Sequence, residues 1–122
     1  MRIIRKEDVK DPLKNPLGEI IYEMIGAPEE LGGTKHHSFV VVTIPPGGSS
    51  ARHWHTISEE TYFILKGTAR MIIDDKELEI RTGHAVLIQP PEQHQILNTG
   101  DDDLDFVAVC APPWTPGDST FV

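Results

Sequence analysis

The chain has 122 residues, and its 11 Lys and Arg against 19 Asp and Glu give a formal net charge of −8 at pH 7. This length predicts one domain with a core of its own. A single cysteine cannot form an internal disulfide, so nothing indicates a disulfide-stapled secreted protein. Affinity for nucleic acids and anionic membranes depends on Lys and Arg, so we expect neither partner.

The N-terminal segment, residues 1–17, is polar and contains Pro12 and Pro16. It lacks the continuous apolar stretch of a signal peptide, and no run in the chain is long enough to span a bilayer. We therefore expect a soluble cytoplasmic protein whose first 17 residues form an arm or a short edge element.

Short segments rich in Val, Ile, Phe and Tyr follow, each bounded by Gly, Pro, Asn or Asp. This pattern is typical of strands separated by turns, and helical periodicity is almost absent, although residues 28–31 could form one helical turn. About nine short strands at this spacing predict an all-β sandwich or barrel over residues 18–112. The expected strands cover residues 19–25, 39–44, 51–55, 61–66, 69–73, 77–81, 85–89, 94–98 and 105–111.

Residues 113–122 are expected to form a C-terminal tail. Prolines lack the backbone donor that a β-ladder requires, so Pro112, Pro113 and Pro116 end the last expected strand. The tail is then either packed on the barrel, most simply through Trp114, or loose. The acidic run at residues 101–103 is most simply a solvated hairpin tip, with a cation site as its alternative.

The residues that carry chemistry begin with His53 and His55, which lie two apart on an expected strand. Their side chains leave the same face, the geometry by which two imidazoles share one metal ion. Glu60 lies five residues beyond His55, so the chain must turn at residues 56–58 if this carboxylate is to join them. His94 begins another expected strand and has Asn98 on the same face.

These residues resemble a known family. The spacing of Gly47, His53, His55, Glu60 and Gly67 is similar to the first motif of the cupin superfamily at every fixed position. The resemblance implies a small single-domain cupin, whose fold is an antiparallel β-barrel or jelly roll of the double-stranded β-helix type.

The second cupin motif matches in part. Gly83, a proline at position 90 or 91, His94 and Asn98 follow its order, while Glu92 stands near where a glycine is usual. This departure concerns the turn before His94 and leaves the histidine itself in place.

The resemblance implies that His53, His55, Glu60 and His94 bind one divalent transition metal. Three imidazoles and one carboxylate suit Fe, Mn, Ni, Cu or Zn, and ligand type does not choose among them. Taken singly, each histidine is more often a packed or surface residue than a ligand. Their combination in the family's spacing favours metal binding.

Several other residues receive hypotheses. Tyr62 and Ile64 share the strand face of Glu60, so both would line the cavity, and Tyr62 would serve as proton donor or substrate-orienting group unless it simply packs in the barrel. Asn98 would support the metal ligands or the turn. Cys110 is expected to be a buried small side chain rather than a reactive thiol. Three further histidines lack ligand spacing and are expected to be exposed: His36, His37 and His84.

The cupin resemblance spans dioxygenases, oxalate-degrading enzymes, sugar-phosphate isomerases, lyases and non-catalytic binders, so fold cannot supply the reaction. We favour a metal-dependent enzyme of the dioxygenase or isomerase type that acts on a small oxygen-bearing metabolite. One alternative is a non-catalytic cupin that binds or senses a sugar or effector and keeps a structural metal. A metal-free structural barrel is the third. The resemblance also suggests a homodimer, to which the N-terminal arm could add an edge strand.

Overall fold

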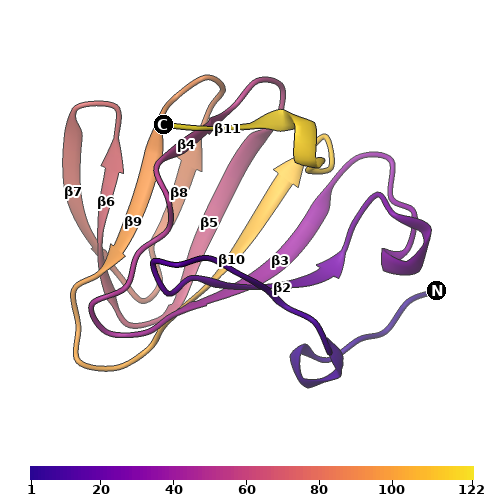
Figure 1. Ribbon diagram of the computed structural model, residues 1–122, viewed down its shortest axis with the longest axis horizontal. Coiled ribbons are helices and arrows are strands. Elements are labelled where there is room, and N and C mark those ends of the chain that lie inside the picture. Colours follow the sequence, from indigo (N-terminus) through magenta and orange to yellow (C-terminus); the bar gives the residue numbers. More distant parts are fainter.

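The computed structural model describes residues 1–122, and strands make up most of its ordered elements (Figure 1). All nine expected strands are present as β2 to β10, with bounds within two residues of those predicted. In chain order the elements are η1 (Lys6–Asp8), β1 (Leu13–Lys14), β2 (Ile20–Ile25), η2 (Glu29–Leu31), β3 (Ser38–Ile44), β4 (His53–His55), β5 (Glu59–Lys66), β6 (Thr68–Ile73), β7 (Lys76–Arg81), β8 (Ala85–Ile88), β9 (His94–Asn98), β10 (Leu104–Ala111), η3 (Pro116–Asp118) and β11 (Ser119–Phe121).

The strands form two antiparallel sheets, which confirms the predicted all-β jelly-roll architecture. One sheet has the order β1-β2-β3-β10-β5-β8, and the other has the order β11-β4-β9-β6-β7. The chain passes repeatedly from one sheet to the other, and two of these passages lie between β4 and β5 and between β9 and β10. Residues from these four strands can therefore meet in the interior although they belong to different sheets.

The core is formed by side chains that alternate between buried and more exposed positions along the strands. In β5, β9 and β10 every second residue is buried, as a strand with one face on the core requires. Ile44 and Phe106 from one sheet meet Ile96 from the other in a cluster that is fully buried. This cluster fills one end of the space between the sheets.

The two terminal segments add short strands to the edges. Leu13 pairs with Ile21, so residues before β2 extend the six-stranded sheet. At the other end, β10 stops before the prolines, and the chain returns through η3 to pair β11 with β4 (Figure 1). Strand β11 is not among those that the sequence predicts, because it is three residues long and follows a proline-rich segment.

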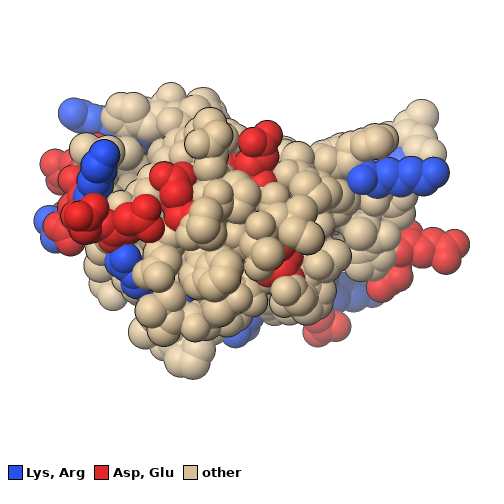
Figure 2. Space-filling model, turned by 90° about the horizontal axis from the view of Figure 1, so that it is seen from above, with Lys and Arg blue, Asp and Glu red and all other residues tan.

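The surface agrees with the sequence's charge. Figure 2 shows that acidic side chains lie in the middle of the face seen there, while most Lys and Arg side chains lie towards its ends and lower edge. That face therefore presents no continuous basic patch of the kind a nucleic-acid backbone needs. None of the helical segments has the length and apolar character needed to cross a membrane.

Candidate metal centre

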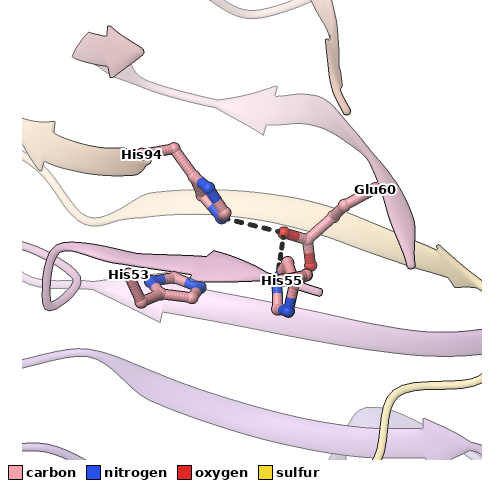
Figure 3. Close-up of side chains that lie close together, drawn as sticks. All are labelled: His53, His55, Glu60 and His94. Atoms are coloured by element: carbon pink, nitrogen blue, oxygen red, sulfur yellow. Dashed lines mark hydrogen bonds and ion pairs between the residues drawn. The ribbon is translucent and has the colours of Figure 1, made fainter. Parts of the chain in front are cut away.

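The structure brings the four predicted ligands together in the interior. His53 and His55 on β4, Glu60 on β5 and His94 on β9 each offer one ligand atom, and these four atoms all lie within 4.8 Å of one another (Figure 3). The side chains of His55, Glu60 and His94 are buried. Such a set of three imidazoles and one carboxylate could hold a divalent metal ion.

Strand pairing explains how the histidines meet. His53 lies directly opposite His94 in the β4–β9 pair, and His55 follows two residues later on the same face of β4. Glu60 comes from the other sheet, because residues 56–58 carry the chain across as its spacing from His55 requires. The carboxylate of Asp118 accepts hydrogen bonds from the backbone N–H groups of Ile57 (2.8 Å) and Ser58 (3.1 Å), and so holds this turn.

In each of the three histidines a protein oxygen lies within hydrogen-bond distance of the Nδ1 atom and orients the ring. Nδ1 of His53 lies 2.9 Å from the carbonyl oxygen of Ala51, and Nδ1 of His94 lies 3.1 Å from that of Glu92. A carbonyl oxygen can only accept, so these two rings carry hydrogen at Nδ1, and in the neutral ring Nε2 keeps its lone pair. Metal-ligating histidines are commonly oriented by such bonds.

The carboxylate of Glu60 lies close to the Nε2 atoms of two histidines. Its Oε1 atom lies 3.2 Å from Nε2 of His94 and 3.3 Å from Nε2 of His55 (Figure 3). A carboxylate oxygen and an unprotonated ring nitrogen both accept hydrogen bonds, so their close approach is favourable only when a proton or a metal ion lies between them. The donor set therefore fits a bound cation.

Burial and neighbouring charge hold the ligands in their metal-binding forms. Burial alone would raise the pKa of Glu60, but hydrogen bonds and charge from His55 and His94 outweigh burial and leave that pKa below its ordinary value. Burial, with a smaller effect of the His94 charge, lowers the pKa of His53 to about 4. At neutral pH the site thus offers a carboxylate and a neutral His53 imidazole, as metal binding requires.

His55 is oriented by the C-terminal tail. Ser119 lies directly opposite His55 in the β11–β4 pair, and its Oγ atom is 3.3 Å from Nδ1 of His55. The same hydroxyl accepts a 2.7 Å hydrogen bond from Nε1 of Trp114, while an oxygen of Asp118 lies 3.9 Å from Nδ1 of His55. Nothing in the spacing of the ligand motif points to these tail residues.

Cys110 supports Glu60 from the neighbouring strand. The two residues lie opposite each other in the β10–β5 pair, and the thiol donates a 3.1 Å hydrogen bond to Oε2 of Glu60. Burial, followed by the charge of Glu60, raises the pKa of Cys110 well above its ordinary value, so the thiol stays protonated. The expectation of a buried Cys110 is confirmed. Its contact with Glu60 depends on the β10–β5 register, which no local pattern predicts.

Tyr62 lies beside this centre and lines a cavity of about 130 Å³. Its ring centroid is 6.2 Å from that of His94 and 4.6 Å from that of Phe106. Burial and the nearby Glu60 charge raise the pKa of Tyr62 well above its ordinary value, so its hydroxyl keeps its proton. Its chemical role stays a hypothesis. Ile64, expected beside it, lies instead in the packed core.

The structure places Asn98 at the turn after β9. Its amide nitrogen donates to the carbonyl oxygens of Ile44 (2.9 Å) and Asp102 (2.8 Å), and its Oδ1 atom accepts from the Gly100 N–H (2.9 Å). It forms no hydrogen bond with any of the four ligands. The remaining histidines are exposed as expected: His36, His37 and His84.

A partly buried acid that the sequence did not single out lies on the cavity wall. Glu19 precedes β2, and its Oε1 atom accepts a 2.8 Å hydrogen bond from the amide of Asn15. Burial, with a further contribution from the Glu60 charge, raises the pKa of Glu19 to about 7. Glu19 belongs to no recognisable motif, so only the folded structure shows that it lines the cavity.

Comparison with known proteins agrees with the cupin resemblance of the ligand motif. The family model for the cupin domain matches residues 40–110. An uncharacterized protein of Methanocaldococcus jannaschii is 32% identical over 120 residues, which cover 98% of this chain and 94% of that protein. The oxalate-binding protein of Thermotoga maritima is 36% identical over 75 residues, 62% of each chain.

A solved structure with a similar fold is that of the oxalate decarboxylase of Bacillus subtilis, which has Mn(II) centres. Its TM-score is 0.81 at 19% sequence identity, and the match covers 93% of this chain but 30% of the decarboxylase. The chain thus spans less than a third of that protein. At this level of identity the similarity shows a shared fold.

Proposed function

The chain belongs to the cupin family, and from this premise we propose that it is a metal-dependent enzyme that acts on a small oxygen-bearing metabolite. One observation carries the proposal: the Nδ1 atoms of His53 and His94 are held by carbonyl oxygens, while the Nε2 atoms of His55 and His94 face Oε1 of Glu60. His94 has an acceptor at each ring nitrogen, so a proton or a metal ion must lie between its Nε2 atom and Glu60, and a set of three imidazoles and one carboxylate suits a metal ion. Among Fe, Mn, Ni, Cu and Zn we favour Mn or Fe, and the Mn(II) of the similarly folded decarboxylase supports that choice.

The chain's own residues have separate roles in this proposal. His53, His55, Glu60 and His94 hold the metal, which when bound polarises a substrate oxygen or supplies a redox-active centre. Tyr62, protonated and on the cavity wall, orients a substrate oxygen through its hydroxyl. The apolar walls exclude water, which strengthens electrostatic interactions inside the site.

The cavity favours dioxygenase-type over isomerase-type chemistry. A sugar carries a hydroxyl on nearly every carbon, and each buried hydroxyl needs a hydrogen-bond partner. Most of the cavity wall is hydrophobic, and beside the metal-ligand candidates and Tyr62 the side chains that could pair with a hydroxyl are those of Glu19, Glu23, Ser38 and Ser119. Oxidation of a less hydroxylated substrate suits these walls better.

Metal content and oxygen consumption test the proposal. We expect elemental analysis of protein purified without chelator to find close to one Mn or Fe per chain. Protein loaded with that metal should then consume O₂ with at least one member of a panel of 2-oxo and hydroxy acids. Absence of stoichiometric metal, together with failure to bind added Mn(II) or Fe(II), would refute the metal-dependent function.

A second candidate is a non-catalytic binding protein with a structural metal. It is favoured by the relative from Thermotoga maritima, whose name describes an oxalate-binding protein. The two candidates differ in turnover. A ligand that perturbs the Mn(II) electron paramagnetic resonance spectrum but is recovered unchanged after long incubation would favour the binding protein.

We also propose that the outer face of the six-stranded sheet binds a second copy of the chain. Val41 and Val107 lie opposite each other, and Val107 also lies opposite Phe63, which forms an apolar row across three strands. Phe63 and Leu87 are 44% and 56% exposed. Light scattering should give a dimer mass for the native chain and a monomer mass for Phe63→Lys. Leu78→Lys, on the other sheet, is the control, and a native monomer would refute the dimer.

A further inference from the structure

The walls of the cavity carry charge of one sign. Its charged lining residues other than the histidines are Glu19, Glu23 and Glu60, and neither Lys nor Arg lines it. A metal ion is therefore the only counter-charge that this site can offer to an anion. A divalent ion beside Glu60 leaves a net charge of about one at the ligands, and ionisation of Glu19 or Glu23 lowers the charge of the cavity further, so a ligand with at most one negative charge suits it.

Small side chains open a trough next to the ligands. Across the sheet from Glu60 and Tyr62 lie Cys110 and Ala108 on β10. The next positions along the same two rows, on β3, are Ser38 and Val40. None of these four side chains is large, so the space above them stays open.

The trough runs from the metal ligands towards β2. Glu23 on β2 lies opposite Val40, and three strand spacings separate β5 from β2, about 14 Å. Ile21 and Ile25 close the far side, and Trp114 from the tail contributes to the wall. Apart from its acidic groups, this space is suited to an apolar body.

Resting on the proposed function, we infer that the site takes a ligand of about six carbon atoms with two parts: a metal-chelating end with at most one negative charge, and an apolar body lying along the trough. The volume supports this size, because a cavity of about 150 Å³ with apolar walls holds benzene, and this cavity measures about 130 Å³. Oxalate has two negative charges and no apolar part, so it uses neither feature of the trough.

A matched pair of 2-oxo acids tests the apolar body on the Mn(II)-loaded full chain. Pyruvate and 4-methyl-2-oxopentanoate share the same chelating end and differ by three carbon atoms. Burial of one methylene strengthens binding about fourfold, so we expect the longer acid to bind at least tenfold more tightly. Isothermal titration calorimetry measures the affinities, and the Mn(II) resonance spectrum reports binding at the metal.

A second pair tests the charge. Oxalate and oxamate have nearly the same size, but oxamate carries one negative charge. Free Mn(II) in the same buffer gives the reference ratio of the two affinities. On the loaded protein we expect the advantage of oxalate over oxamate to shrink at least tenfold, because Glu19 and Glu23 line the same cavity.

One variant locates the trough. Val40→Phe should abolish the preference for 4-methyl-2-oxopentanoate while leaving pyruvate affinity within threefold. Its control is Leu78→Phe, at an exposed position on β7 that lies outside both the cavity and the proposed dimer face and should keep the preference. The two ligand pairs on the native chain decide the question if Val40→Phe does not fold.

The outcomes separate this inference from the function on which it rests. Equal affinity for the two 2-oxo acids, an undiminished advantage of oxalate, or binding of none of the four acids overturns the ligand class, while the metal-dependent function stands. A titration with Mn(II) alone precedes all of these experiments. If that titration shows no binding of Mn(II), and Fe(II) does not bind either, the proposed function itself fails.

Discussion

Two ends of the interior are built from the same strands and differ in polarity. On β5 the buried row begins with Glu60 and ends at Ile64, and on β9 it begins with His94 and continues to Ile96. His94 and Ile96 have the same exposure, 0%. At these two positions the withdrawal from water is equal, and only the side-chain chemistry changes.

This comparison indicates that strand alternation determines which residues are buried. For a polar residue, its hydrogen-bond partners determine whether burial is tolerated. A buried polar group costs stability unless it is hydrogen-bonded. No buried side-chain nitrogen or oxygen of the chain lacks a partner. The polar end thus keeps a candidate cation site within a fold that the apolar end stabilises. Substitutions at the two ends should affect different properties.

The largest expected effect is on metal affinity, at the polar end. Glu60→Gln keeps the shape of the side chain but removes the only negative charge among the four ligands, so we expect Mn(II) affinity to fall about a thousandfold, roughly 4 kcal/mol. Calorimetric titration with Mn(II) measures this change. Glu59→Gln, the exposed neighbour on β5, should bind as the native chain does. A loss of less than tenfold in Glu60→Gln would show that the carboxylate is not a ligand.

The next effect is on stability, at the apolar end. Ile64 is completely buried, and Ile64→Ala removes three carbon atoms from a packed cluster, so the free energy of unfolding should fall by about 3 kcal/mol. Urea denaturation of the metal-free protein measures it, and the half-exposed Leu65→Ala should lose less than 1 kcal/mol. Mn(II) affinity should stay within threefold. A comparable loss of affinity would mean that the two ends are not independent.

Local patterns in the sequence predicted most of this arrangement. The alternation of apolar residues and the turns between them gave all nine central strands, since both are properties of a few neighbouring residues. His53 and His55 share a face because they are two apart. The odd separation of Glu60 required a turn, and the change of sheet between β4 and β5 provides it.

Features that depend on distant pairing could not be predicted. Ser119 reaches His55 only because β11 pairs with β4, across 64 residues of sequence. Cys110 reaches Glu60 through the β10–β5 register. Glu19 is partly withdrawn from water because it faces a cavity formed by several strands. No spacing rule connects these residues, since each contact is set by how the two sheets assemble.

Glu19 allows a test of the polar end by pH in the metal-free protein. Its pKa is raised to about 7 from an ordinary 4.5, so the folded chain binds its proton more tightly than the unfolded chain. The resulting stability is present below pH 4.5 and is lost as pH rises through 7. Gln does not titrate, so Glu19→Gln should be more stable than the native chain by up to about 3 kcal/mol at pH 8 and nearly equal to it at pH 4.

Urea denaturation at several pH values measures this difference. Glu77→Gln changes an exposed acid on β7 and should show no such dependence on pH. A Glu19→Gln advantage that did not grow between pH 4.5 and pH 7 would mean that Glu19 ionises freely, and that the acidic wall of the cavity is solvated. Bound Mn(II) should reduce the advantage, because a nearby cation stabilises the carboxylate.

The smallest effect tests whether the C-terminal tail belongs to the polar end. The Ser119 hydroxyl lies 3.3 Å from Nδ1 of His55, and removing a group that orients a metal-ligating histidine costs tenfold or more in affinity. We expect Ser119→Ala to bind Mn(II) about tenfold more weakly, as measured by calorimetry, with the midpoint of urea unfolding almost unchanged. Thr120→Ala alters the neighbouring residue, which lies opposite Trp54 rather than His55, and should leave affinity unchanged. Equal affinity of Ser119→Ala and the native chain would show that the Ser119 hydroxyl does not orient His55, and would leave Asp118 as the tail residue nearest that ring.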